Sequence, residues 1–177
     1  MNRFSGLKVV LTLLLIVLSV PSFSQCEILN RVYPDGTMLY YMEPVNFYWT
    51  SAKSLKGCIV TDKENYFLQL LPVPFPEKQE GKKLKEDLDL KLSNGKIYKL
   101  KHYDTSYDEK DTVIVMQILF VIQKEELVDF QNFEVEEVTM KMLKDEGNRT
   151  YVFKLHKAAL KEQLTCFLKE EEDKKKK

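Results

Sequence analysis

Residues 88–101 decide the fold, and they read LDLKLSNGKIYKLK. Apolar and polar side chains alternate on both sides of an Asn-Gly pair, a pattern that indicates two β-strands joined by a hairpin turn. A two-residue Asn-Gly loop would set Leu90 opposite Lys99 and split the apolar side chains between the two faces. A three-residue Ser-Asn-Gly loop, with Gly95 in the left-handed region, instead sets Leu90 opposite Tyr98. The alternation therefore predicts the three-residue loop, since it keeps one face apolar.

Apolar runs on either side of this hairpin predict further strands. Residues 113–122, VIVMQILFVI, are almost continuously apolar, as expected for a central strand that is covered on both faces. Upstream, residues 55–61 and 66–71 flank a short polar turn and predict another hairpin. Pro44 should fall between two strands or at a strand edge, because it has no N–H group to donate.

A third hairpin is expected between residues 133 and 155. Its apolar positions slip by one at Glu136-Glu137, which predicts a β-bulge there. With a connection built from residues 145–148, one apolar face is kept by three cross-strand pairs. These pairs are Met142 with Tyr151, Met140 with Phe153, and Val138 with Leu155.

The C-terminal region has the period of an α-helix. From His156 onward, apolar side chains recur at helical spacing and form one stripe that should lie on the sheet. The stripe consists of Leu160, Leu164, Phe167 and Leu168. We expect a β-rich α+β domain of seven or eight mostly antiparallel strands. They would form a single antiparallel β-sandwich or a strongly curved sheet, with a C-terminal amphipathic helix packed on it.

The first residues have the pattern of an export signal. Residues 1–24 combine a basic start, a short apolar segment and small residues before a cut after Ser24, which is typical of a signal peptide. This predicts a single domain over residues 25–168 and a charged disordered tail over residues 169–177, with no transmembrane span after signal removal. Gln25 is bulky and polar, which argues against a lipid anchor at Cys26.

Charge and cysteine content exclude some functions. Signal removal takes Arg3 and Lys8 from the 27 basic side chains and none of the 27 acidic ones, so the chain has no positive field to attract nucleic acid. Three cysteines remain, Cys26, Cys58 and Cys166, and export permits a disulfide. The spacing predicts either one bridge or buried free thiols, and it leaves the pairing open.

One segment could hold a cation. Residues 102–111, HYDTSYDEKD, bring together His102, Asp104 and further acids, which could supply imidazole and oxygen ligands if they lie on one loop. We favour an ordinary polar loop between two buried strands. No residue is assigned as catalytic, cofactor-binding or metal-ligating, and no cofactor is expected.

An aromatic group lies between residues 40 and 49. Its members are Tyr40, Tyr41, Phe47, Tyr48 and Trp49. Aromatic faces can stack on a sugar or another flat ligand, although such residues more often alternate into a β core. We favour the core, and keep Tyr40, Tyr48 and Trp49 as candidate ligand contacts together with His102 and Asp104.

Several segments carry a resemblance to a known group of proteins. They are the signal end SFSQ and the blocks GCIVTDKENYFLQLLPVPFP, LSNGKIYKLKHYD, FVIQKEELVDFQNFEVEEV and RTYVFKLHKAALKEQLTCFLK. On these, the chain resembles the small exported proteins of unknown function of Bacteroidetes-type bacteria. The resemblance implies a periplasmic or secreted setting in a Gram-negative cell, and it carries over no functional residue.

The residues together predict a non-enzymatic role. The chain has few groups that titrate near neutral pH and no converging nucleophile and base, so we expect an interaction or small-ligand-binding domain in the bacterial envelope. Its partner would be an unknown protein or a glycan. The alternative is a metal-dependent hydrolase that uses the loop from His102 to Asp111. The ligand, the oligomeric state and association with the outer membrane stay open.

Overall fold

The structure is a computed structural model that describes residues 26–33, 35–74, 84, 86–110, 113–142 and 147–175. Within these ranges the side chains of residues 108–110, 113, 114, 174 and 175 are not described. The expected signal peptide over residues 1–24 lies outside the described residues. Most of the proline-rich connection after Pro74 and the loop at residues 143–146 also lie outside them.

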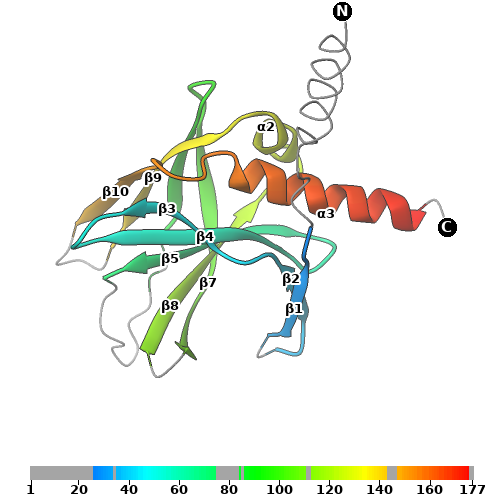
Figure 1. Cartoon of the computed structure of the whole chain (residues 1–177), viewed down its shortest axis with the longest axis horizontal. Helices are drawn as coiled ribbons and strands as arrows, with labels where there is room; N and C mark the ends of the chain where they lie inside the picture. Colours follow the sequence, from blue (N-terminus) through cyan, green and yellow to red (C-terminus); the bar gives the residue numbers. More distant parts are fainter. Residues whose placement is uncertain are drawn as a thin grey trace, which may run out of the picture.

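The described residues form a ten-stranded antiparallel sheet and two helices (Figure 1). The strands run in the order β1-β2-β4-β5-β8-β7-β6-β9-β10, and β3 also pairs with β4. The elements are β1 (Leu29–Val32), β2 (Met38–Tyr41), β3 (Val45–Trp49), β4 (Ser54–Thr61), β5 (Tyr66–Val73), β6 (Leu88–Leu92), β7 (Ile97–Lys110), β8 (Val113–Ile122), α2 (Leu127–Asn132), β9 (Val135–Lys141), β10 (Asn148–Val152) and α3 (Ala159–Lys175).

The expected fold class is confirmed, with more strands than the seven or eight predicted. The sequence did not reveal β1, because it has only four residues and every second one is exposed. Pro44 lies between β2 and β3, as expected. The apolar run of residues 113–122 is β8, which lies between β5 and β7 as a central strand.

The register predicted for residues 88–101 is confirmed. Leu90 lies opposite Tyr98, Leu88 lies opposite Leu100, and Gly95 has a φ of +83°. The predicted bulge is also present. Lys91 and Leu92 on β6 face Glu137 and Val135 on β9, so that Glu136 is the extra residue.

The register predicted for β9 and β10 is wrong by four residues. Tyr151 lies opposite Val138 and not opposite Met142. Both registers put the same side chains on the same face, because a shift by an even number of residues does not change the alternation. The observed register frees the end of β10 to leave β9 and reach β3, which no local pattern encodes.

The sheet curls until the segment that follows β10 meets β3. The backbone N–H groups of Lys154 and Leu155 donate to the carbonyl of Phe47, at 3.0 and 3.1 Å. At this junction the rings of Phe47 and Phe153 stack, with centroids 4.2 Å apart. The inner face of the curled sheet thereby encloses the main core.

Helix α3 covers the open side of this core, as the amphipathic stripe predicted. Leu160, Leu164 and Phe167 are buried, and Leu168 packs at the edge of the cluster. Gln163 on the same helix has a buried side chain that accepts a 2.8 Å hydrogen bond from the backbone N–H of Ile59. Ile59 lies on β4 between the segments paired with β2 and with β3, so Gln163 satisfies a donor that the sheet leaves open.

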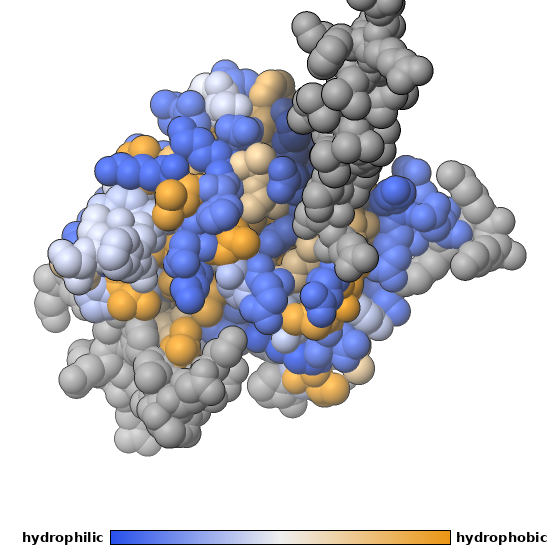
Figure 2. All heavy atoms as spheres, in the orientation of Figure 1, coloured by the Kyte–Doolittle hydropathy of each residue, from blue (hydrophilic) through white to orange (hydrophobic). Residues whose placement is uncertain are grey.

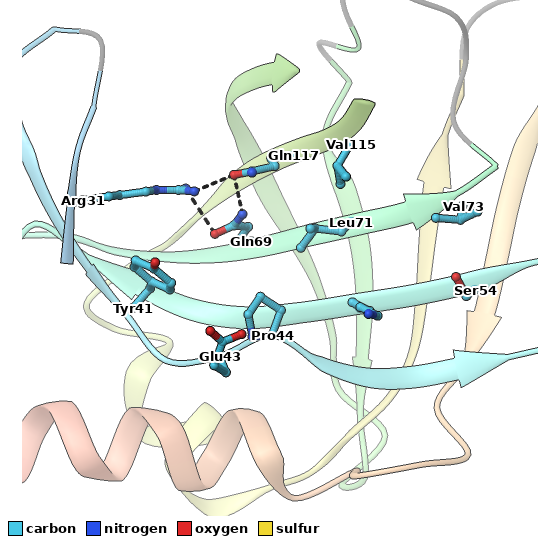
Figure 3. Close-up of a pocket in the computed structure, with 11 residues that line it drawn as sticks. Arg31, Tyr41, Glu43, Pro44, Ser54, Gln69, Leu71, Val73, Val115 and Gln117 are labelled. Carbon is cyan, nitrogen blue, oxygen red and sulfur yellow. Dashed lines mark hydrogen bonds between the residues drawn. The ribbon is translucent and has the colours of Figure 1, made fainter. Parts of the chain in front are cut away.

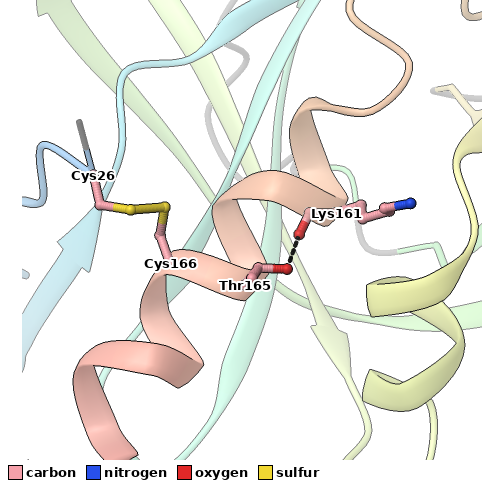
Figure 4. The surroundings of a disulfide bond; sticks show 4 residues. All are labelled: Cys26, Lys161, Thr165 and Cys166. Carbon is pink, nitrogen blue, oxygen red and sulfur yellow. Dashed lines mark hydrogen bonds between the residues drawn. A yellow bond between two sulfur atoms is a disulfide. The ribbon is translucent and has the colours of Figure 1, made fainter. Parts of the chain in front are cut away.

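A disulfide ties the start of β1 to this helix (Figure 4). Cys26 and Cys166 are bonded, with their Cα atoms 5.7 Å apart, while Cys58 is free and buried. Of the two predicted alternatives, the structure therefore contains the one with a single disulfide bridge.

The expected disordered tail over residues 169–177 is wrong for most of its length. Helix α3 continues to Lys175. The hydroxyl of Tyr66 donates a 2.5 Å hydrogen bond to Glu171, which holds this charged extension against β5. Burial, followed by the neighbouring carboxylate of Glu171, raises the pKa of Tyr66 well above its usual value. The charged sequence of this segment gave no indication of the hydrogen bond between Tyr66 and Glu171.

The surface seen in Figure 2 is mostly hydrophilic, and its apolar residues occur in small separate groups. In the described part of the chain, no helix has both the length and the apolar character that a membrane crossing requires.

Gly57 provides a test of the packing between β4 and β5. A Cβ atom at this position would lie 2.6 Å from the carbonyl oxygen of Gln69 and 2.9 Å from Leu70 Cδ2. We expect Gly57→Ala to lower the free energy of unfolding by about 1–3 kcal/mol because it overpacks the site. Urea denaturation measures this change. The exposed strand residue Lys99 supplies the control, since Lys99→Ala should change stability by less than about 0.5 kcal/mol. Equal stability of Gly57→Ala and the parent protein would contradict the close approach.

Candidate functional site: a groove across strands β4, β5 and β8

The segment expected to be a polar loop, with a cation site as the alternative, is a strand instead. Residues 102–110 belong to β7, which pairs with β8. The register shifts at Tyr103, so that His102 lies opposite Phe120 while Asp104 lies opposite Leu119. Phe120 belongs to the main core and Leu119 to a smaller cluster on the outer face. The bulge therefore sends His102 and Asp104 to opposite faces, where they cannot share a cation.

Both side chains have structural partners. His102 Nε2 lies 2.8 Å from Thr105 Oγ1, and this hydroxyl donates its proton to the carbonyl of Leu84 at 2.8 Å. Nε2 must then be the donor to Thr105, since the hydroxyl has only one proton. On the outer face, Asp104 accepts a hydrogen bond from the hydroxyl of Tyr33. Burial and the Asp104 carboxylate raise the pKa of Tyr33 well above its usual value.

The remaining candidates of this segment lie outside the description. The side chains of Asp108 and Glu109 are not among those described, and Asp111 lies outside the described residues. Within the ranges that the structure describes, no three His, Cys, Asp or Glu side chains come close enough together to hold a metal ion.

The aromatic group is dispersed. Phe47 is fully buried, and Tyr48 packs edge-on against Tyr151 with centroids 5.5 Å apart. Trp49 is 69% exposed, and Tyr40 lies under the ammonium group of Lys63, 4.3 Å from the ring centroid. Tyr40, Tyr48 and Trp49 therefore do not form one platform.

A groove lies elsewhere, on the outer face of the sheet (Figure 3). It has a volume of about 490 Å³, which is within the usual range for small-molecule sites. Its polar end contains Arg31, Tyr41, Gln69 and Gln117, and its apolar part contains Leu71 and Val115. Of the predicted aromatic group, only Tyr41 contributes to it.

Two glutamines form the floor of the polar end. Gln69 on β5 and Gln117 on β8 are 2% and 8% exposed, within otherwise apolar strands. Gln69 Nε2 donates to Gln117 Oε1 at 2.7 Å, and both side-chain oxygens point toward Arg31. Buried amides need such partners, because an unsatisfied amide costs about 1–3 kcal/mol.

Arg31 on β1 completes this network. Its guanidinium donates to Gln117 Oε1 at 2.7 Å and to Gln69 Oε1 at 3.3 Å. It also lies 5.4 Å from the centroid of the Tyr41 ring, within reach of a cation–π contact. At the polar end, the positively charged guanidinium of Arg31 is thus held by the uncharged side-chain oxygens of Gln69 and Gln117.

The charge of Arg31 is not neutralised within the described part of the chain. No ion pair involves it there, and its Nε atom is buried without a hydrogen-bond partner. Glu43 and Lys56 also line the groove, and Lys56 comes from the end of β4. A cation without an ion pair is unfavourable in a partly buried place, so the groove is chemically suited to an acceptor from outside the chain.

Cys58, the free cysteine, lies on β4 beneath the outer face. Its side chain is fully buried, and its Sγ lies 3.7 Å from Gln69 Oε1. Burial raises the pKa of this thiol to about 12, so it stays protonated and unreactive at neutral pH. This agrees with the expectation of a structural thiol.

Sequence reasoning missed Arg31, Gln69 and Gln117. One local signal was present, since each glutamine interrupts an apolar run that was predicted to be a strand. A polar residue at such a position requires a partner, and this requirement marks a candidate site. The partner itself could not be inferred, because Arg31 lies 38 residues from Gln69 and 86 from Gln117.

Comparison with known proteins finds no matching family model, no matching curated protein and no matching solved structure.

The network predicts energetic coupling between Arg31 and Gln117. Arg31→Met and Gln117→Leu should each lower the free energy of unfolding by about 1–3 kcal/mol, because each leaves a buried polar partner unsatisfied. The double variant should lose less than the sum of the two changes by about 0.5 kcal/mol or more. Urea denaturation of the four proteins measures this coupling. Combining Arg31→Met with the distant Lys99→Met serves as control and should be additive. Additivity of Arg31→Met and Gln117→Leu would contradict the network.

Proposed function

We propose that this protein is an exported, non-catalytic domain that binds a small ligand in the groove over β4, β5 and β8. The observation that carries the proposal is the guanidinium of Arg31, held in place by two buried glutamines beside an apolar wall. Small-molecule sites commonly combine an apolar lining with a few oriented polar groups. The predicted protein or glycan partner in the bacterial envelope stays a hypothesis, because no described residue points to such a partner.

Two features support the export part of the proposal. The leader over residues 1–24 has the layout of a signal peptide, and disulfides such as Cys26–Cys166 persist mainly in oxidising compartments. The same bridge argues against a lipid anchor, since the sulfur of Cys26 is already bonded to Cys166.

Among the described side chains, no observation supports the alternative of a metal-dependent hydrolase. His102 and Asp104 face opposite sides of the sheet, and each has a structural partner.

Groove binding is tested with N-phenyl-1-naphthylamine, a neutral dye whose fluorescence rises in an apolar site. We expect saturable binding of the dye to the purified, oxidised protein. Leu71→Trp fills the apolar part of the groove and should weaken binding by about tenfold or more, equivalent to about 1.4 kcal/mol. Val128→Trp places the same side chain on the exposed face of α2, far from the groove, and should bind as the parent does. Equal binding by all three proteins, or no binding by the parent, would rule out this groove as the site.

Export is tested by intact mass. The full chain, expressed with its own leader in a Gram-negative host, should yield a periplasmic product that begins at Gln25. Its mass should be lower by two hydrogens than after reduction, because Cys26 and Cys166 form a disulfide. A product that begins at Met1, or one with a diacylglyceryl group on Cys26, would contradict the proposal.

A further inference from the structure

We propose that the groove binds an amphipathic monocarboxylate, with its carboxylate at Arg31 and its apolar chain along Leu71 and Val115. This inference rests on the proposed function and specifies the chemical class of the ligand. It follows from the donors left at Arg31, the charges around the groove and the division between its polar and apolar parts.

The polar end has free hydrogen-bond donors where a carboxylate would lie. A guanidinium carries five N–H donors, and Arg31 gives two hydrogen bonds to the glutamines. Nη1 and Nη2 each give one of these hydrogen bonds, so each keeps a second N–H group. A carboxylate accepts such donors in pairs, and it would also neutralise a charge that no described side chain neutralises.

The glutamines position this cation without cancelling its charge. Gln69 and Gln117 contribute neutral oxygen acceptors, and their hydrogen bond to each other fixes both amides. Arg31 is therefore oriented before a ligand arrives, which lowers the entropic cost of binding. Had aspartate or glutamate occupied these positions, the guanidinium would be paired internally and an anionic ligand would be unnecessary.

The charges around the groove favour one negative charge on the ligand. Arg31 and Lys56 are cationic and Glu43 is anionic, so the three together leave one positive charge. Glu43 repels a second carboxylate near the polar end, which disfavours dianions. A cationic ligand would be repelled by the positive charge of Arg31 at the polar end.

The rest of the groove suits an apolar chain. Beyond the glutamines, Leu71 on β5 and Val115 on β8 line the groove, and Pro44 and Val73 continue the apolar lining (Figure 3). Covering these side chains removes apolar surface from water on both partners, at about 25 cal/mol per Å². A ligand with only a carboxylate would leave this surface exposed, so the chain should contribute to affinity as well as the head.

The experiment compares three ligands with the same chain and different heads. Isothermal titration with decanoate, decan-1-ol and decylamine, below micelle-forming concentrations, uses the oxidised protein. We expect decanoate to bind at least about tenfold more tightly than decan-1-ol, since a hydrogen bond to a charged group contributes more than a neutral one. Decylamine should bind more weakly than either, and acetate alone should not bind measurably.

Variants assign this preference to Arg31. Arg31→Met keeps an unbranched side chain without the charge and should remove the preference, so that decanoate binds no more tightly than decan-1-ol. Lys99→Met removes an exposed lysine on β7 outside the groove and should leave both affinities unchanged. Arg31→Lys keeps the charge without the planar donors, so the preference for decanoate should be reduced but present. Thermal unfolding of each variant verifies that it is folded, and Arg31→Lys keeps the test informative if Arg31→Met does not fold.

Two further ligands distinguish the natural sources of this chemistry. N-acetyl-leucyl-valine and its C-terminal amide present the same apolar-carboxylate pairing on a peptide. Tighter binding of decanoate than of the free-acid peptide would identify a fatty-acid type of ligand, and the reverse would identify a peptide end. Either result supports the carboxylate proposal if the amide binds more weakly than the acid.

The outcomes separate this inference from the proposed function. Equal binding of decanoate and decan-1-ol, with both lost in Leu71→Trp, would overturn the carboxylate proposal and leave the groove as a ligand site. An unchanged preference for decanoate in Arg31→Met would also overturn it. Absence of binding by all ligands, including N-phenyl-1-naphthylamine, would overturn both proposals.

Discussion

The structure depends on the burial of β5 and β8 on both of their faces. Their inward side chains, among them Leu68 and Ile118, belong to the main core that the curled sheet and α3 enclose. Their outward side chains, among them Phe67 and Leu119, form a second cluster with Leu39 on β2. A strand that is apolar on both faces is stable only where both faces are covered. The hairpin of β1 and β2 therefore has to lie over the outer face.

The groove is a consequence of this second layer. Because β1 and β2 extend from one end of β4, they cover only part of the outer face, and the groove begins where the cover ends. At that margin Arg31 reaches from β1 to glutamines on β5 and β8. The disulfide between Cys26 and Cys166 holds the start of this hairpin to α3, which covers the inner side. It closes a loop across a sequence separation of 140 residues, which restricts the unfolded chain.

Much of the fold was predictable because it follows from local periods. Alternation between two faces was sufficient to place Leu90 opposite Tyr98 and to locate the bulge at Glu136. It could not select among registers that differ by an even number of residues, which is why Tyr151 was paired with the wrong residue of β9. The observed register leaves Phe153 beyond the end of β10, where its ring stacks on Phe47 of β3.

The sequence by itself determined the strand alternation, the β8 core strand and the amphipathic stripe of α3, since each depends on neighbours within one element. Only the tertiary structure decided which residues form a site. A one-residue bulge at Tyr103 separated His102 from Asp104, although both lie on one short segment. Curvature of the sheet brought Arg31 to the two glutamines from another hairpin. Contacts between residues of different strands depend on how the sheet curves and which strands cover its outer face. This geometry is set by the packing of the whole chain.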